Sequence, residues 1–308
     1  MKNKSIKNIR QEFKNQGIFY TPKALAEKLK SYVDIKPRDV YDPTCGAGNL
    51  LSAFPDEIPK YGQELDEIQL NEIELPNFTG CAGDTLTDDG FKGKQFHCIV
   101  ANPPFSVKWN PDEAANDERF KDAPALPPPS KADWAFMLHI LHHLADDGIA
   151  VILEFPGILY RGQREYKVRR WFCENGYIER VVEIEGGTFE DTAIGMCLIV
   201  MKKNRTSRTI VFERKEQIRA VEYDEIKKND FTLSPSQYIE DEVTKEPIDP
   251  VCLERDARRN FLTKLKKELD FESIVCRMEG ISIKPFLDAI ICITRKYYKE
   301  DEANAGDV

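Results

Sequence analysis

The chain has 308 residues, of which 41% are hydrophobic and 31% charged, and this fits a globular protein with one large α/β domain and an appendage, or with two modest domains. No apolar run approaches the ~18 residues of a membrane span, and the charged residues 1–5 are not followed by the apolar core of a signal peptide. The net charge of −9 counts against a general nucleic-acid binder. The 8 cysteines are scattered without CxxC spacing, which indicates reduced thiols of a cytoplasmic protein and no zinc site.

The first predicted element is a helix that begins near residue 22. Thr21 is a suitable N-cap and Pro22 suits the first helical position. Leu25 and Leu29 then follow at helical spacing, which predicts an amphipathic helix. The aromatic pair just before it, residues 19–20, has no role in this helix pattern.

Residues 40–51 have the layout of a strand, a glycine turn and a helix. Gly46 and Gly48 let the backbone approach a ligand closely, and the N-terminus of the helix offers N–H groups to an anion such as a carboxylate. A lone GxG pattern is weak evidence, but the flanking strand and helix strengthen it.

Acidic residues follow the next two predicted strands. Glu64 ends the second strand, where a carboxylate can bind both ribose hydroxyls of an adenosine ligand, whereas Asp66 is expected to cap the next helix. Asp84 ends the third strand. It can accept a hydrogen bond from an adenine amino group or simply cap a turn.

The fourth predicted strand, residues 96–101, runs directly into Asn102, Pro103, Pro104 and Phe105. The two prolines end the strand because neither donates a backbone N–H. The Asn102 amide oxygen and the Pro103 carbonyl can then accept both hydrogens of one aromatic amine, which favours a pyramidal nitrogen with an available lone pair. Phe105 can stack on the ring that carries the amine. Taken alone, the same pattern fits a strand-ending turn with an Asx-type asparagine.

Together these strand ends resemble the S-adenosylmethionine-dependent N6-adenine DNA methyltransferases, and most closely the modification subunit of type I restriction systems. The resemblance is carried by FYTP at 19–22, DPTCGAG at 42–48, YGQE at 61–64, GDTL at 83–86 and NPPF at 102–105. This order of motifs is that of the gamma class. Further stretches at 126–136, 157–162, 189–194 and 229–238 extend the similarity to about residues 15–240.

The resemblance implies a doubly wound, mostly parallel, seven-stranded Rossmann-like sheet and a set of site residues. Asn102, Pro103, Pro104 and Phe105 would be the catalytic turn, with Phe105 and Phe189 on the two faces of a flipped base; Phe189 is equally consistent with a core position. The cofactor pocket would be formed by Phe19, Tyr20, Thr21, Pro22, Asp42, Pro43, Thr44, Cys45, Gly46, Gly48, Asn49, Glu64, Asp84 and Asn102.

Three further features have two interpretations each. The polar, proline-rich residues 106–131 are a candidate loop that closes over substrate. Arg161 and Arg164, in a basic stretch that ends at Arg170, are candidate phosphate contacts, although such a stretch is often only a solvated helix face. The histidines at 139, 142 and 143 suggest a metal, but the sequence offers no nearby carboxylate or cysteine pattern, so surface or packing histidines are expected.

We expect three regions: an N-terminal arm at 1–15, the methyltransferase domain at 16–240 and a helical extension at 241–308. The extension has two short helices, near 251–270 and 283–299, which must pack on the domain or on a partner. On a type I modification subunit it would be a docking site for a specificity subunit.

The expected reaction is methyl transfer from S-adenosylmethionine to N6 of a flipped adenine in double-stranded DNA, without a metal, in a system that also has a specificity subunit and possibly a restriction subunit. The alternatives are methylation of a protein glutamine amide or an RNA base, or a non-catalytic assembly subunit. Fewer than twenty residues precede the FYTP motif, where the modification subunits carry a helical domain. With the charge of −9, this predicts weak DNA binding by the chain alone.

Overall fold

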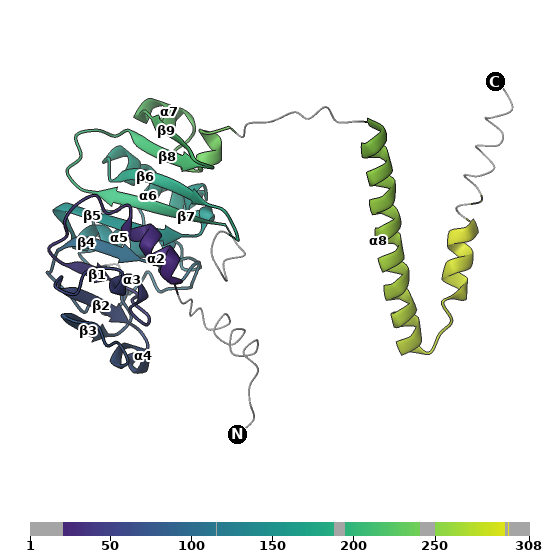
Figure 1. Cartoon of the computed structure of the whole chain (residues 1–308), viewed down its shortest axis with the longest axis horizontal. Coiled ribbons are helices and arrows are strands. Elements are labelled where there is room, and N and C mark those ends of the chain that lie inside the picture. The colour runs from purple at the N-terminus through teal and green to yellow at the C-terminus, as the bar shows by residue number, and fades with distance from the viewer. Residues whose placement is uncertain (1–20, 115, 188–194, 241–249, 293–294, 296–308) are drawn as a thin grey trace. The chain divides into compact units, whose positions relative to one another are not determined.

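The computed structural model describes residues 21–114, 116–187, 195–240, 250–292 and 295. The chain divides into two compact units, residues 1–241 and 242–308. Among the described residues, those of the first unit form a large sheet with helices, and those of the second unit are mostly helical (Figure 1). No helix among the described residues is long and apolar enough to cross a membrane.

Nine strands of the described chain form one sheet in the order β3-β2-β1-β4-β5-β7-β6-β8-β9. Their bounds are β1 Val40–Asp42, β2 Lys60–Glu64, β3 Phe78–Ala82, β4 Phe96–Ala101, β5 Leu144–Glu154, β6 Ile178–Ile184, β7 Met196–Lys202, β8 Ile210–Arg214 and β9 Gln217–Val221. The five strands from β3 to β5 pair in parallel, and β7 is antiparallel to both β5 and β6. The fold class is therefore the predicted doubly wound α/β sheet.

The predicted strand count of seven is wrong, because β8 and β9 extend the sheet beyond β6. Strand β8 pairs in parallel with β6, and β9 is antiparallel to β8. The two strands are joined at Lys215 and Glu216, whose φ angles of 47° and 65° form a tight hairpin turn. Neither residue is a usual choice for positive φ, and β9 is largely exposed, so the sequence lacks both the turn signal and the apolar pattern of a hairpin.

Helices cover both faces of the sheet. On one face, Leu25, Leu29 and Leu51 pack on Cys98 and Val100. On the other face, the helix side chains of Trp134 and Phe172 belong to the cluster that contains Ile99 and Ala101. Successive residues of β4 thus serve opposite layers, as strand geometry requires. The helices of this unit are α2 Lys23–Lys30, α3 Asn49–Ser52, α4 Glu67–Asn71, α5 Asp133–His143, α6 Gln163–Glu174 and α7 Tyr223–Lys228, with 3₁₀ turns η1 Pro156–Leu159 and η2 Pro235–Gln237.

The start of α2 differs from the prediction by one position. Pro22 is the N-cap, and its carbonyl accepts hydrogen bonds from the N–H groups of Leu25 and Ala26. Thr21 is therefore not the capping residue, and its hydroxyl is available for a contact outside the helix.

The strand order reverses between β1 and β4, since the chain passes from β1 outward to β3 and then returns to the other side of β1. The carboxyl ends of strands at such a reversal form the usual ligand crevice of an open α/β sheet. The glycine turn after β1 and the Asn102 turn after β4 are therefore neighbours in space.

In the second unit, α8 (Pro250–Glu279) is a 30-residue helix, nine residues longer than predicted at its C-terminal end, and residues 284–292 are also helical. Large apolar side chains on these helices are solvent-exposed, namely Phe261, Leu262, Phe271, Ile274, Met278, Phe286, Leu287 and Ile291.

Candidate active site

A cavity of about 680 Å³ lies at the carboxyl ends of β1, β2, β3 and β4. Most of the predicted cofactor residues with described positions line it: Thr21, Asp42, Pro43, Thr44, Cys45, Gly46, Asn49, Glu64, Asp84 and Asn102, together with Pro103 and Pro104 of the predicted catalytic turn. Phe19, Tyr20 and Phe189 lie outside the described residues. Pro22 and Gly48 adjoin lining residues and shape the backbone beside the cavity.

Asn102 is oriented by the residue before α2. Its side-chain Nδ2 donates a hydrogen bond to Thr21 Oγ1 at 3.0 Å, and Asn49 Nδ2 donates to the Thr21 carbonyl at 3.1 Å. The Asn102 Oδ1 atom is buried and has no hydrogen-bond partner among the described residues. An amide oxygen left without a partner loses about 1–3 kcal/mol relative to its hydrated state. A donor that enters the cavity can recover this energy.

The glycine turn is held by backbone hydrogen bonds and by Glu64. The Glu64 carboxylate accepts from the N–H of Gly46 at 2.8 Å and from that of Asp66 at 3.1 Å. Gly48 N–H donates to the Cys45 carbonyl at 2.7 Å. Two N–H groups of the turn therefore already have acceptors within the protein. Gly46 and Gly48 have φ angles of 52° and 78°, which favour glycine at both positions.

Asp42 is an acid that this fold keeps un-ionised. Burial of the side chain raises the pKa of Asp42 to about 8, and the nearby charge of Glu64 adds to the increase, while the hydrogen bond from Thr44 N–H (3.0 Å) opposes it. At neutral pH the cavity therefore holds Asp42 largely in its protonated form. A bound cation would favour the ionised form.

The turn after β3 is tied to its neighbours. Asp84 caps it by accepting from Leu86 N–H at 2.9 Å, and Asp84 also lines the cavity, so its two predicted roles are compatible. Asp66 caps α4 as predicted, by accepting from the N–H groups of Ile68 and Gln69. The buried side chain of Gln63 donates to the Asp88 carbonyl at 2.6 Å. Thr85 Oγ1 donates to the Pro43 carbonyl and so connects this turn to the glycine turn.

The long segment 106–131 contributes to the wall of the cavity. Val107, Lys108 and Trp109 line it, as do Leu65 and Phe136. The backbone N–H of Trp109 donates to Pro129 O and its indole Nε1 to Pro128 O, each at 3.0 Å. We missed these residues because no residue type or spacing identifies a wall that is formed by loop packing. Phe105 is half-buried and packs on the apolar cluster that contains Leu25, and it does not line the cavity.

Arg161 was predicted to contact phosphate, and this stays a prediction; in the structure its guanidinium already has partners inside the protein. Its guanidinium bonds Asp133 Oδ2 at 2.8 Å, Glu165 Oε1 at 3.2 Å and Ser106 Oγ at 3.0 Å. The N–H of Ser106 donates to Asp133 Oδ1 at 2.7 Å. The Arg161 guanidinium is thus paired inside the protein, where its bond to Ser106 supports the residue that follows Phe105.

The basic stretch is divided between the surface and the interior: Arg164, Lys167 and Arg170 are exposed on α6. Arg169 is 2% exposed and donates to the carbonyls of Phe231 and Arg161. Arg170 pairs with Glu174 at 2.7 Å. Arg164 is exposed on α6, and its predicted phosphate contact stays a prediction.

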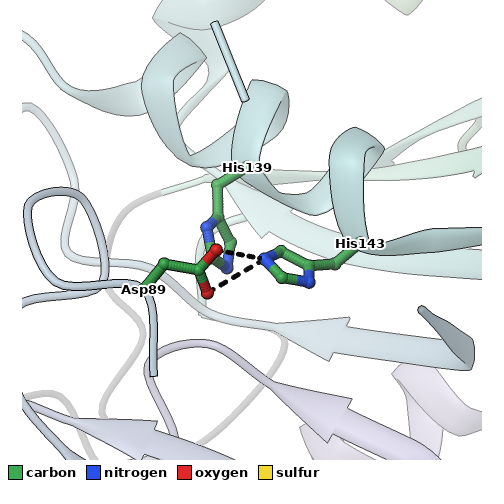
Figure 2. Close-up of side chains that lie close together, drawn as sticks. All are labelled: Asp89, His139 and His143. Atoms are coloured by element: carbon green, nitrogen blue, oxygen red, sulfur yellow. Dashed lines mark hydrogen bonds and ion pairs between the residues drawn. The ribbon is translucent and has the colours of Figure 1, made fainter. Parts of the chain in front are cut away.

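The histidines of α5 have a carboxylate nearby, contrary to our expectation. Figure 2 shows Asp89 beside His139 and His143, and ligand atoms of the three residues lie within 4.8 Å of one another. His143 Nε2 is 3.1 Å from Asp89 Oδ1, and its Nδ1 donates to the Lys94 carbonyl at 2.7 Å. His139 and His143 are fully buried, as packing histidines are.

The hydrogen bonds of these side chains argue against a metal ion bound between Asp89, His139 and His143. Arg119 Nη1 is 2.9 Å from His139 Nδ1, and an arginine only donates, so Nδ1 is the acceptor. Burial holds the pKa of His139 well below its ordinary value, so the ring is neutral and Nε2 carries its hydrogen, donated to Tyr41 Oη at 3.0 Å. Neither nitrogen of His139 offers a free lone pair, and the positive Arg119 lies 3.9 Å from Asp89.

Comparison with known proteins agrees with this geometry. A sequence profile of the N-6 DNA methylase family matches residues 6–219. The chain belongs to this family. It is 30% identical over 340 residues to the methylase subunit of the type I restriction enzyme MpnII of Mycoplasma pneumoniae, an alignment that covers 85% of this chain and 62% of that protein.

Solved structures show the same fold. The methyltransferase subunit of a type I restriction-modification system from Streptococcus thermophilus superposes with a TM-score of 0.62 and 29% identity over 70% of this chain and 58% of that one. A class I S-adenosylmethionine-dependent methyltransferase from Listeria monocytogenes has a TM-score of 0.50 and 16% identity over 66% of this chain and 70% of that one. The chain thus spans about three fifths of the type I relatives that it matches.

Proposed function

We propose that this N-6 DNA methylase transfers the methyl group of S-adenosylmethionine to N6 of a flipped-out adenine in DNA, as the modification component of a system with a separate specificity subunit. The observation that carries the proposal is the Asn102 amide oxygen, buried without a partner among the described residues, in the same cavity as the glycine turn.

The cavity suits S-adenosylmethionine in size and in charge. It has a volume of about 680 Å³, within the usual range for small-molecule sites. The acidic side chains of Glu64, Asp66 and Asp84 line it beside the protonated Asp42, and among the described lining residues Lys108 is the one lysine or arginine. Such a lining favours a ligand that carries positive charge. The cofactor, when bound, supplies a methyl group that is already activated by its sulfonium sulfur.

The protein's task is then to present the adenine nitrogen correctly. Leaving the duplex costs the base a few kcal/mol, which the enzyme must recover by contacts to the flipped base. Asn102 Oδ1 and the Pro103 carbonyl are the acceptors proposed for the two amino hydrogens. When both hydrogens are held, the nitrogen lone pair turns out of conjugation with the ring. Thr21 fixes the amide so that its oxygen, and not its nitrogen, is free for the substrate.

Transfer of tritium from labelled cofactor to DNA, with the cognate specificity protein present, tests the proposal. Asn102→Ala should abolish incorporation while the affinity for S-adenosylmethionine, measured by titration calorimetry, changes little. Asn102→Asp, which keeps an acceptor oxygen, should retain part of the activity. Equal incorporation by wild type and Asn102→Ala would overturn the assignment, and label in protein or RNA instead of DNA would overturn the substrate.

We propose the second unit as the docking site of the specificity subunit. Phe271, Ile274 and Met278 recur at helical spacing on α8 and are 64%, 54% and 83% exposed. An exposed apolar row of this kind is typical of a protein interface. The net charge of −9 also favours a partner that supplies the DNA contacts.

Phe271→Glu combined with Met278→Glu should abolish co-purification with the specificity protein and leave cofactor binding unchanged. The matched control is a double substitution of exposed charged residues of the same helix, Lys266→Glu and Glu268→Gln, which should leave co-purification intact. Retained complex in the first variant would contradict this docking site.

A further inference from the structure

Arg119 is a buried arginine in the middle of the segment 106–131, with 5% of its surface exposed. Its guanidinium reaches the turn after β3: Nη1 donates to the Thr85 carbonyl at 2.5 Å and Nη2 donates to the Leu86 carbonyl at 2.9 Å. These two carbonyls follow Asp84 directly. One side chain of the segment thus fixes the backbone of the turn that carries the acid predicted to bind the cofactor's adenine.

The same guanidinium contacts the helix layer behind the sheet. Nη1 donates to His139 Nδ1 at 2.9 Å, and His139 in turn donates to Tyr41 Oη at 3.0 Å. Tyr41 immediately precedes Asp42 on β1. Arg119 is therefore linked to two of the strand ends that form the cavity, β3 directly and β1 through His139.

The charge of Arg119 is balanced locally. Asp117 accepts from Nε at 3.0 Å and from Nη2 at 2.6 Å, and Asp89 lies 3.9 Å from Nε. Burial alone would raise the pKa of Asp117, but the hydrogen bonds from Arg119 outweigh it and hold the pKa of this carboxyl below its ordinary value. A paired and fully hydrogen-bonded cation can remain in the interior and keep one geometry.

We infer that Arg119 is a positioning residue for the cofactor pocket: it fixes the Asp84–Leu86 turn through the carbonyls of Thr85 and Leu86, and so sets the affinity for the adenosine part of S-adenosylmethionine. This inference rests on the proposed function, because it assigns a role within the same cavity. Arg119 does not line that cavity, and therefore acts on the ligand through the turn.

The test uses the full chain and S-adenosylmethionine in titration calorimetry. Arg119→Met removes every donor, and Arg119→Lys keeps the positive charge beside Asp117 but cannot bridge two carbonyls and a histidine. Loss of the two hydrogen bonds to the carbonyls of Thr85 and Leu86 predicts about a tenfold rise in Kd for both variants. The KM for S-adenosylmethionine should rise with it, whereas the KM for DNA should not change.

Arg205→Met is the matched control. Arg205 also donates to several backbone carbonyls, those of Gly176, Ile178 and Thr209, but it is remote from the cavity lining. A similar loss of thermal stability in Arg205→Met with an unchanged Kd would show that the effect of Arg119 is not a general consequence of destabilisation.

A double-mutant cycle with Asp84→Ala completes the test, because residues that act through one another are not additive. In the Asp84→Ala background, Arg119→Met should raise the Kd less than about twofold. Wild-type affinity in both Arg119 variants, or an effect equal to that of Arg205→Met, overturns the inference and leaves the proposed function standing. If the wild-type chain does not bind S-adenosylmethionine, the proposed function and this inference both fail.

Discussion

The turn after β1 and the turn after β4 meet in one cavity, but different forces hold them. The β1 turn depends on backbone conformation, on glycines at positive φ and on an acid kept neutral by burial. The β4 turn depends on side chains: Thr21 bonds Asn102, and the buried pair of Arg161 and Asp133 bonds Ser106. The β1 turn also uses a distant side chain, since Glu64 accepts from the N–H of Gly46, but that bond fixes a backbone. The bond from Asn102 to Thr21 fixes a side chain instead.

The pH dependence of stability should separate the two turns most strongly. Because the folded pKa of Asp42 is raised to about 8, the folded protein keeps a proton that the unfolded chain has lost above about pH 4. Stability should therefore fall as pH rises from about 4 to 8, by at most about 1.4 kcal/mol per pH unit from this group, and should not change further above that. Urea denaturation of wild type and Asp42→Asn measures it. If the stabilities of wild type and Asp42→Asn changed with pH in the same way, Asp42 would not be protonated in the folded protein.

The second-largest effect is expected from removal of Arg161, which should destabilise the β4 turn. Arg161→Met leaves the buried carboxylates of Asp133 and Glu165 without their cation, and breaking such a pair costs about 3–5 kcal/mol. Chemical denaturation should show this loss, and methyl transfer should slow more than cofactor binding weakens. Arg170→Met, which breaks the exposed pair with Glu174, serves as the control and should leave the denaturation midpoint almost unchanged.

A smaller effect is expected from Gly48→Ala. An added methyl group would lie 3.0 Å from Leu75 and 3.2 Å from Ile73, and the left-handed backbone costs an L-residue about 1–2 kcal/mol. Gly93→Ala has a similar φ of +76° and no atom within 4 Å, so it reproduces the backbone strain alone. Calorimetry should show weaker binding of S-adenosylmethionine for Gly48→Ala and unchanged binding for Gly93→Ala. Equal affinities would show that the glycine turn does not shape the pocket.

The smallest effect belongs to Asp66, which caps α4. Asp66→Ala should cost about 1 kcal/mol, whereas Asp66→Asn should cost much less because it retains an acceptor. Thermal melts of the two variants distinguish a capping role from a ligand contact: a cofactor affinity that falls more than stability does would give Asp66 a place in the site itself.

Features that depend on neighbouring residues were predictable from the sequence. The strand that leads to Asn102 follows from its local run of apolar residues and has the predicted bounds, 96–101. The meeting of four strand ends follows from their order in a parallel sheet. The family resemblance that these strand ends carry then implied the fold class and most of the cavity lining.

Features that depend on distant pairing were not predictable. Arg161 is joined to Asp133 and Ser106 across 28 and 55 positions. The basic composition of 161–170 suggested a phosphate site because the sequence does not show which arginines are buried. Arg119 has no motif at all. Its role depends on two backbone carbonyls, and a carbonyl has no sequence signature. The edge hairpin of β8 and β9 was not predicted, because Lys215 and Glu216 form its turn and neither is a usual residue for positive φ.

The length of α8 has a mechanical consequence. At 1.5 Å per residue, its 30 residues extend about 45 Å, which exceeds the ~34 Å of one turn of B-form DNA. A protein bound at one end of α8 would therefore be held about 45 Å from a protein bound at its other end. The helix is thus long enough to act as a spacer on the scale of the double helix.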